Sequence, residues 1–297
     1  MPSGPRAVTR IAGLLAVVAT TSAVAGILTG GGPGRHAVET TRGVVVTVYG
    51  AGLYAADTWL VGAGNRGQDV VVLAVEVPIL LLALRWYRRG GAVEAAVMTG
   101  VLAFFAYFYV SMVFATAQNR LFPVYVAGAA LALFGTVLAA WGTDAARVAE
   151  ALPDRPGRRA LAAYLFLVAA ALTLAWVPDL VATALTGDVA QAVGPYTSTV
   201  TEALDVGLVV PVAVLAAELT FRGSDLGRVL ALVLLVVNVC IGVLLMGQGV
   251  AQLVAGVSLT VGEVIAKMAT FAALTLVAGG MLARKRRKAV RRPAGLR

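Results

Sequence analysis

The chain has 297 residues, of which 60% are hydrophobic and 13% charged, whereas a soluble domain carries about 25% charged residues. This deficit excludes an ordinary soluble globular protein. The net charge of +9 would suggest a nucleic-acid partner in a soluble protein, but here the basic residues lie at the ends of apolar segments and in a tail. We therefore expect a membrane protein that binds no nucleic acid.

The rare residue types exclude several kinds of site. The chain contains one histidine, His36, and one cysteine, Cys240. Bis-histidine haem, Cys/His zinc sites and iron–sulfur clusters each need more such ligands than this. No G-x-x-x-x-G-K-[ST] loop for ATP is present. The sequence therefore predicts no metal site and no cofactor, and an enzymatic activity is not the favoured interpretation.

Eight apolar stretches have the length of about 20 residues that a membrane-spanning helix needs. They cover approximately 11–29, 69–86, 92–115, 122–141, 160–178, 203–220, 227–246 and 262–283. The pattern predicts an all-α, polytopic transmembrane helix bundle. The first stretch also has features of a signal peptide, since Arg6 and Arg10 precede it and Ala23-Val24-Ala25 ends it. Its full spanning length favours a retained anchor.

The distribution of arginine and lysine gives an orientation, because cytoplasmic loops of membrane proteins are enriched in both. With the N-terminus in the cytoplasm, only Arg35, Arg42, Arg66 and Arg120 fall outside, and Lys267 falls within the last span. All other basic residues lie inside. We therefore expect both termini in the cytoplasm and the protein in the cytoplasmic membrane.

The predicted spans divide into two halves of four helices. Residues 1–142 form the N-terminal half, which includes an outer interfacial element at 43–68, and 160–283 form the C-terminal half. The cytoplasmic loop 143–159 separates them. No internal repeat is strong enough to indicate an inverted-repeat transporter.

Two segments near the outer surface are ambiguous. Residues 43–64 are almost apolar enough for a ninth span, but their five glycines, Asp57 and the spread of aromatic residues favour an interfacial or re-entrant element. Residues 248–258 resemble a short outer interfacial helix whose wet face carries Gln248 and Gln252.

The basic tail 284–297 begins with Arg284-Lys285-Arg286-Arg287-Lys288. A polybasic run beside a membrane span binds anionic headgroups, at about 1 kcal/mol per residue. We expect the lipid bilayer and its anionic lipids as partners of the tail.

Charged side chains within apolar spans are costly and mark candidate functional sites. Glu76 lies in the second span beside Pro78, which leaves a backbone carbonyl without its helical donor. Such an acid could bind a cation or relay a proton, or it could be a protonated side chain bonded to a neighbouring helix.

Glu263 and Lys267 are secondary candidates in the last span. They are four residues apart and therefore share one helix face. An ion pair that reaches the interface is the simpler interpretation. Lys267 also resembles the Schiff-base lysine of retinal proteins, but it lies too near the helix start, and eight spans replace seven.

The third span carries a polar stripe that includes Tyr107 and Ser111, four residues apart. Thr116 and Asn119 continue this stripe outward. Asp57 and Asp69 come from the preceding outer segment and could close over the same end, which predicts an outward-facing polar vestibule.

Several short motifs resemble a family of prokaryotic multi-pass membrane proteins of unknown function. They are Tyr49-Gly50-x-Gly52-Leu53-Tyr54-x-x-Asp57-Thr58, Gln68-Asp69, Pro78, Tyr107, Tyr109, Asn119-x-Leu121-Phe122-x-x-Tyr125, Leu204-Asp205-Val206-Gly207-Leu208 and the stretch 241–264. The resemblance covers most of the chain and implies a shared helical fold, but it brings no substrate or reaction.

The sequence thus favours an integral membrane protein with an outward-facing polar pocket, transporter-like or binding a small polar or cationic ligand. The predicted ligand-binding residues are Tyr54, Asp57, Asp69, Glu76, Tyr107, Tyr109 and Asn119.

Two other classes remain open. One is a membrane-embedded enzyme acting on a lipid or polyprenyl carrier, with Asp57 or Asp69 as acid/base and Arg66 or Arg120 as phosphate clamp, although no D-D-x-x-D motif supports it. The other is a non-catalytic scaffold or assembly subunit whose small-residue helices pack against a membrane-protein partner.

Overall fold

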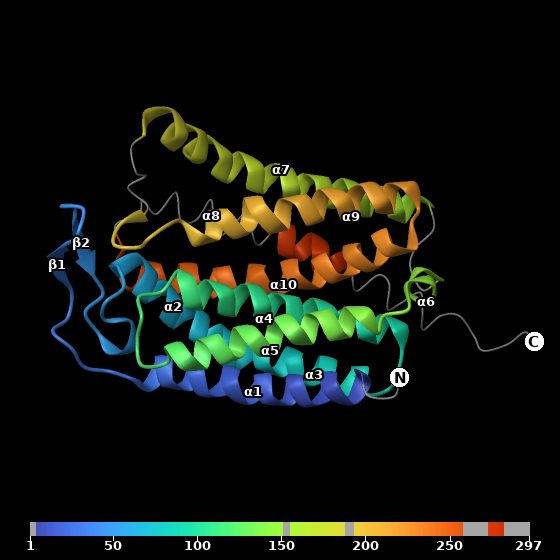
Figure 1. The fold of residues 1–297 in the computed structure, drawn as a ribbon, viewed down its shortest axis with the longest axis horizontal. Helices are drawn as coiled ribbons and strands as arrows, with labels where there is room; N and C mark the ends of the chain where they lie inside the picture. Colours follow the sequence, from blue (N-terminus) through green and yellow to red (C-terminus); the bar gives the residue numbers. More distant parts are fainter. Residues whose placement is uncertain (1–3, 151–154, 188–192, 258–272, 282–297) are drawn as a thin grey trace, which may run out of the picture.

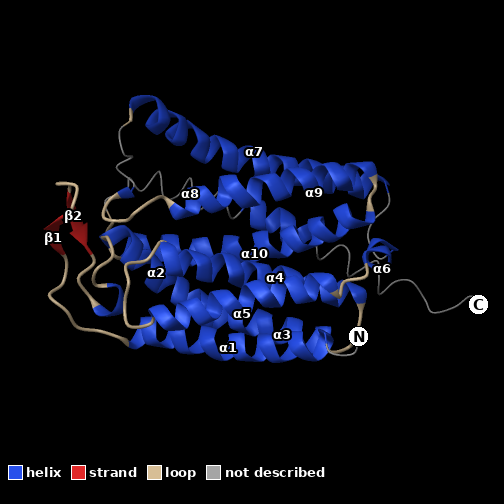
Figure 2. Cartoon of the chain, viewed as in Figure 1, coloured by secondary structure: helices blue, strands red, loops and turns tan. Residues whose placement is uncertain are grey.

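The computed structural model describes residues 4–150, 155–187, 193–257 and 273–281. In these ranges the backbone is mostly helical and forms an elongated bundle (Figure 1, Figure 2). The α-helices are α1 (Gly4–Leu28), α2 (Trp59–Val71), α3 (Val77–Tyr87), α4 (Ala92–Phe114), α5 (Phe122–Trp141), α6 (Ala145–Glu150), α7 (Arg155–Thr186), α8 (Val200–Leu204), α9 (Val210–Arg222) and α10 (Asp225–Val254). Residues 273–281 are also helical.

A small hairpin caps one end of the bundle, which we call the hairpin end (Figure 1). Its antiparallel strands are β1 (His36–Glu39) and β2 (Val45–Val48), with His36 opposite Val48. A 3₁₀ helix, Gly52–Tyr54, follows β2. The opposite end carries α6, and we call it the α6 end.

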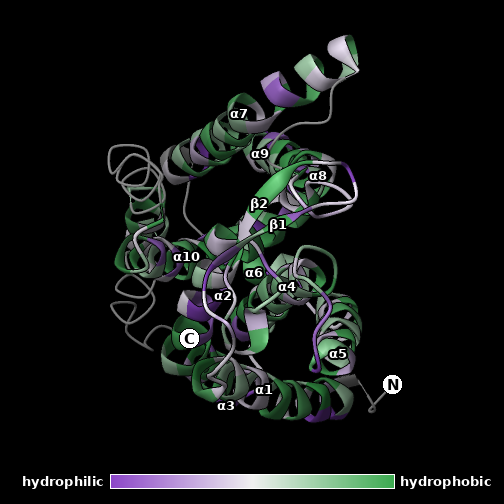
Figure 3. Cartoon of the chain, turned by 90° about the vertical axis from the view of Figure 1, so that its left-hand side faces the viewer, coloured by the Kyte–Doolittle hydropathy of each residue, from purple (hydrophilic) through white to green (hydrophobic). Residues whose placement is uncertain are grey.

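Seven helices in the described ranges are long and apolar enough to cross a membrane: Pro5–Leu28, Trp59–Tyr87, Ala92–Phe114, Phe122–Trp141, Gly157–Thr186, Val200–Arg222 and Asp225–Val254. Figure 3 shows hydrophobic residues on the outward surfaces of these helices as well as between them. Trp141 is 90% exposed and Leu185 82% exposed. Exposed apolar side chains over whole helices are expected where lipid rather than water surrounds the bundle.

Seven of the eight predicted spans are found in the described ranges, and three predicted boundaries differ. The second span begins at Trp59, so residues 59–68 of the predicted outer element belong to it. Residues 248–254 continue α10 instead of forming a separate interfacial helix. The predicted loop 143–159 contains α6 and the start of α7. In the first two cases polar side chains suggested a boundary, but Gln68 bonds Gln248 and Gln252 bonds the Leu60 carbonyl, so that α2 and α10 pair along these segments.

Three predictions concern residues that lie partly or wholly outside the described ranges. Of the eighth span, at 262–283, only 273–281 is described. Glu263, Lys267 and the tail 284–297 lie outside these ranges.

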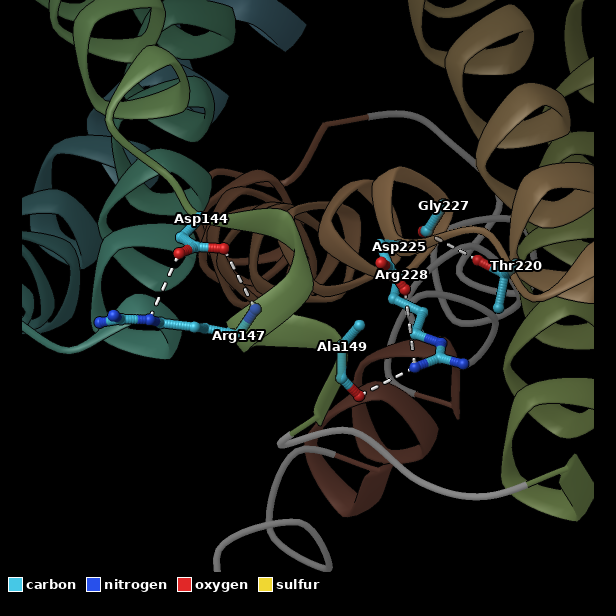
Figure 4. A network of polar contacts seen from close by, with 7 residues as sticks. All are labelled: Asp144, Arg147, Ala149, Thr220, Asp225, Gly227 and Arg228. Atoms are coloured by element: carbon cyan, nitrogen blue, oxygen red, sulfur yellow. Dashed lines mark hydrogen bonds and ion pairs between the residues drawn. The ribbon is translucent and has the colours of Figure 1, made fainter.

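The α6 end is fastened by polar contacts that join both halves (Figure 4). Asp144 caps α6 by accepting from the Arg147 N–H at 3.2 Å. The Arg228 guanidinium of α10 donates to the Ala149 carbonyl at 2.9 Å. In the turn between α9 and α10, the Thr220 hydroxyl donates to the Gly227 carbonyl at 2.8 Å. The short α6 is therefore held against the start of α10.

The structure contains a repeat that the sequence pattern does not show. A five-residue π-helical segment, Val72–Glu76, joins α2 to α3, and another, Asp205–Val209, joins α8 to α9. Val-Pro follows each segment, with Pro78 and Pro211 in the first turn of α3 and α9. Because a π segment opens the helical hydrogen-bond ladder, two at matched places indicate related architecture.

The match continues without a gap into the following helices. Gly90 and Gly223 both adopt positive φ, at 80° and 88°, and they lie the same distance along the chain from Pro78 and Pro211. In the same register, the first residue of α4 corresponds to the first residue of α10. The second and third spans of one half thus correspond to those of the other, and each pair runs in the same direction (Figure 1). The repeat is parallel, not inverted.

Two large apolar clusters and a small one, which joins α4, α6 and α10, form the core of the described chain. The largest one joins α1, α3, α4 and α5, with Val236, Cys240 and Leu244 of α10 closing it. The second joins α7, α9 and α10 with Ala278. The helix α1 buries one face completely in the first cluster. The halves meet where α10 packs on α2 and α4.

Candidate functional site

The loop between β2 and α2 places two predicted site residues inside the hairpin end. Gly50 and Gly52 adopt positive φ, 69° and 59°, which glycine tolerates without strain. The Gly50 N–H donates to the Ala55 carbonyl at 2.9 Å, and the Asp57 N–H donates to the Tyr54 carbonyl at 3.0 Å. This tight turn directs the side chains of Tyr54 and Asp57 inward, where both are buried.

Tyr54 binds Asp69, and both belong to the predicted site residues. The Tyr54 hydroxyl donates to Asp69 Oδ2 at 2.7 Å. Burial, and then the charge of Asp69, raise the pKa of Tyr54 well above its usual value. The helix α1 passes close by, since a Cβ on Gly26 would overlap Asp69 Oδ2. The tyrosine therefore stays a hydrogen-bond donor to a buried carboxyl group.

Asp57 is completely buried and joins three segments of the chain. Its Oδ1 accepts from the Ala117 N–H at 2.7 Å and from the Tyr196 hydroxyl at 2.8 Å. The Tyr196 hydroxyl in turn accepts from the Thr58 N–H at 3.1 Å. Burial raises the pKa of Asp57 to about 6, although these two hydrogen bonds oppose the shift.

Three buried polar atoms next to this network have no hydrogen-bond partner among the described residues. They are Asp57 Oδ2, Asn119 Nδ2 and the Tyr125 hydroxyl. They lie near one another, since the Tyr125 hydroxyl makes polar side-chain interactions with Asn119 and Tyr54 and interacts electrostatically with Asp57. Unpaired buried polar groups cost about 1 to 3 kcal/mol each. We call these three groups, an acceptor, a donor and a hydroxyl, the polar triad.

The hairpin connects this site to the C-terminal half. The Arg42 guanidinium donates to the carbonyls of Gly194 and Tyr196, the latter at 2.6 Å. Together with the bond between Tyr196 and Asp57, these contacts close the hairpin end across the two halves. The predicted vestibule is thus a closed, hydrogen-bonded network in this structure.

Glu76 lies apart from this network, at the last position of the first π segment. Its side chain is completely buried, and neither carboxyl oxygen has a hydrogen-bond partner among the described residues. The thiol of Cys240 in α10 lies beside it. A buried charge without a partner is strongly unfavourable, so this carboxyl group requires a proton or a counter-ion.

Tyr107 faces the C-terminal half, where its contacts within the described chain lie apart from Glu76 and the polar triad. Its hydroxyl donates to Asp205 Oδ1 at 2.9 Å, and Trp176 Nε1 donates to Asp205 Oδ2 at 2.9 Å. Tyr109, two residues further on, instead pairs with Ser22 of α1 at 2.9 Å. The two tyrosines therefore serve different halves, because successive residues point in different directions around a helix.

The structure divides the predicted site residues into three groups. Tyr54, Asp57, Asp69 and Asn119 gather at the hairpin end with Tyr109 nearby, while Glu76 and Tyr107 lie elsewhere. Sequence reasoning did not assign a site role to Tyr125, Trp176, Tyr196 or Asp205. Arg66 is one of the two arginines predicted as a phosphate clamp for a lipid-carrier enzyme. In this structure its guanidinium donates to the Ile27 carbonyl at 3.0 Å.

Gln248 and Gln252 provide a further correction at the hairpin end. They do not form a wet face. Gln68 Nε2 donates to Gln248 Oε1 at 2.6 Å, and Gln252 Nε2 donates to the Leu60 carbonyl at 3.1 Å. These bonds join α10 to α2, because polar side chains in an apolar environment seek partners on neighbouring helices.

Comparison with known proteins gives no relative: no family model, no curated protein and no solved structure matches the chain. The resemblance to prokaryotic membrane proteins therefore stays a prediction. The fold itself defines the class, because the described chain is an all-α bundle with seven helices able to span a membrane. It is a multi-pass integral membrane protein.

Proposed function

We propose that this protein is a transporter-like membrane protein that binds a small polar or cationic ligand at the polar triad. The observation that carries this proposal is the convergence of Asp57 Oδ2, Asn119 Nδ2 and the Tyr125 hydroxyl, all buried and without a partner in the described chain. The carboxyl oxygen suits a cationic or hydrogen-bond-donating group, and the amide suits an adjacent acceptor.

The surrounding architecture supports transport rather than binding alone. Ligand sites of secondary transporters lie between repeats and beside interrupted helices. Here the second span of each half contains a π segment followed by proline, and Asp57 contacts Tyr196 of the other half. In the predicted orientation the hairpin end faces outward, and opening the Asp57–Tyr196 contact would expose the polar triad.

A thermal-shift screen with small amines, amino acids and quaternary ammonium ions tests the proposal, followed by uptake of any stabilising compound into proteoliposomes. We expect Tyr125→Phe to weaken binding about fivefold, the effect of one neutral hydrogen bond of about 1 kcal/mol. Asp57→Asn should weaken binding of a cationic compound more strongly.

Tyr164→Phe is the matched control. The Tyr164 hydroxyl donates to the Leu274 carbonyl at 3.2 Å, far from the polar triad. We expect this variant to lose stability but keep its affinity, whereas Tyr125→Phe should keep its stability. Equal affinity in wild type, Tyr125→Phe and Asp57→Asn would refute the proposed ligand site.

A further inference from the structure

The parallel repeat carries one acid in each π segment, at different positions, since the register of the two prolines aligns Glu76 with Val209 and Asp205 with Val72. Each π segment contains one acid, Glu76 at the end of the first and Asp205 at the start of the second. Each acid lies beside the third span of the opposite half: Glu76 next to Cys240, and Asp205 bonded to Tyr107. Cys240 and Tyr107 occupy corresponding positions in α10 and α4, in the same register that aligns the two prolines.

The two acids differ in how their oxygens are satisfied. Both Asp205 oxygens accept hydrogen bonds, from Tyr107 and Trp176, each at 2.9 Å. Neither Glu76 oxygen does so within the described chain. Asp205 thus joins α4 and α7 to the second π segment through hydrogen bonds that occupy both of its oxygens. The Glu76 carboxyl group, in contrast, has unused acceptor capacity.

The backbone next to Glu76 is also open to a cation. The Val77 N–H donates to the Val72 carbonyl, five residues earlier. Pro78 has no N–H to continue this ladder, so it supplies no donor to the carbonyls of the preceding turn. Backbone carbonyls in an interrupted spanning helix, next to a carboxylate, are the oxygens that coupling ions use in transporters.

The charge around Glu76 limits the ion. Within the described chain, Cys240 is the titratable side chain that interacts with Glu76. The helices α1 and α3 pack beside the π segment, but none of their titratable side chains interacts with Glu76. The described residues also contain no group of three or more His, Cys, Asp and Glu side chains arranged for a metal ion. One carboxylate can balance a single positive charge but not two.

We infer that the Glu76 carboxyl group, between the first π segment and α10, is a binding site for one monovalent cation, either a proton or an alkali-metal ion. Asp205, the acid of the second π segment, differs because both of its oxygens accept from protein donors. The inference that this site binds a cation depends only on the geometry around Glu76. That the cation drives ligand transport is a further step, which rests on the proposed function.

Labelling of the purified full-length protein with dicyclohexylcarbodiimide tests the site. The reagent reacts with buried carboxylic acids: the acid adds across one C=N bond, its proton passes to nitrogen, and acyl transfer gives a stable N-acylurea. Peptide mass spectrometry locates the adduct. We expect labelling at Glu76 and not at Asp205, with a rate that falls about tenfold per pH unit above the pKa of the acid.

Alkali chlorides distinguish the two ions. If Na⁺, K⁺ or Li⁺ slows labelling several-fold at constant pH and ionic strength, the site binds an alkali-metal ion; if only pH changes the rate, it binds a proton. Either result supports the inference. Three results would overturn the inference. They are a labelling rate that responds neither to pH nor to alkali-metal ions, absence of a Glu76 adduct at every pH from 5 to 9, and equal labelling of Asp205.

Two variants complete the test. Glu76→Gln should abolish the adduct, and Asp205→Asn should leave the rate at Glu76 unchanged. Because the wild-type peptide map locates the adduct by itself, the test remains decisive even if Glu76→Gln fails to fold. The readout needs no transport, so failure of the cation site and failure of the ligand site at the polar triad are separate outcomes.

Discussion

Individual side chains in this protein show how a buried carboxyl group can be tolerated. Asp205 has a donor on each oxygen, Asp69 accepts from Tyr54, and Glu76 has only the weak thiol donor of Cys240 beside it within the described chain. Since desolvation is costly for each of them, these differences separate structural acids from acids available to a ligand. The hydrogen bond between Tyr54 and Asp69 is therefore a structural element whose loss should be measurable.

Gly26→Ala should break this hydrogen bond. A Cβ at Gly26 would overlap Asp69 Oδ2 and would lie 3.0 Å from the Tyr54 hydroxyl oxygen. We expect a loss of about 2 kcal/mol, typical of a hydrogen bond to a charged group, seen as a lower melting temperature in detergent. Gly13→Ala in the same helix is the control, because its Cβ would meet no atom within 4 Å and alanine favours helix. Equal melting temperatures would contradict the prediction.

At the scale of helices, close packing between α2 and α10 holds the two halves together. Gly67 approaches the backbone of α10, since a Cβ there would lie 2.5 Å from the Gly247 carbonyl oxygen and 2.6 Å from Ala251 Cβ. Small residues at such crossings allow the backbones of spanning helices to approach. A methyl group cannot be accommodated against a backbone carbonyl unless the helices separate.

Gly67→Ala should therefore destabilise the protein by about 1 to 3 kcal/mol through overpacking. Gly207→Ala, in the second π segment, is the control, because its Cβ would have no neighbour within 4 Å. Size-exclusion chromatography and thermal unfolding in detergent measure the effect. If both variants behave as the wild type, α2 and α10 are not packed as described.

At the scale of the whole molecule, Asp57 makes closure of the hairpin end sensitive to pH. Burial raises its pKa from 3.8 to about 6, so the folded, closed network binds a proton more tightly than the exposed carboxyl group does. The stabilisation from this proton is complete below pH 3.8 and is lost as the pH rises through about 6. Acid should therefore favour the folded network, in which Asp57 is buried, over the unfolded chain.

Asp57→Asn should remove this part of the pH dependence. Between pH 5 and pH 7.5 we expect the wild type to lose about 1 to 2 kcal/mol more stability than the variant. Melting temperatures of both proteins across this range measure the difference. Asp225→Asn, an exposed acid at the α6 end, should retain the wild-type profile. A wild-type profile in Asp57→Asn would show that Asp57 does not control closure.

Much of the candidate site was recognisable from sequence because acids in apolar surroundings stand out. Asp57, Asp69 and Glu76 were identified in this way, and all three are buried. Tyr196 and Asp205 were not assigned roles, because their partners are more than 90 residues away in the sequence. The repeat was also missed, since π segments have no simple residue pattern and few side chains match between the halves.

Composition and the spacing of apolar runs were sufficient to establish a multi-pass helical membrane protein, because a bilayer requires long apolar helices whose backbone groups are paired internally. Which polar groups face one another depends on helix rotation and on contacts between distant segments. Only the tertiary structure could therefore separate the hairpin-end network from Glu76, pair Tyr107 with Asp205, and show that the second and third spans of the two halves correspond.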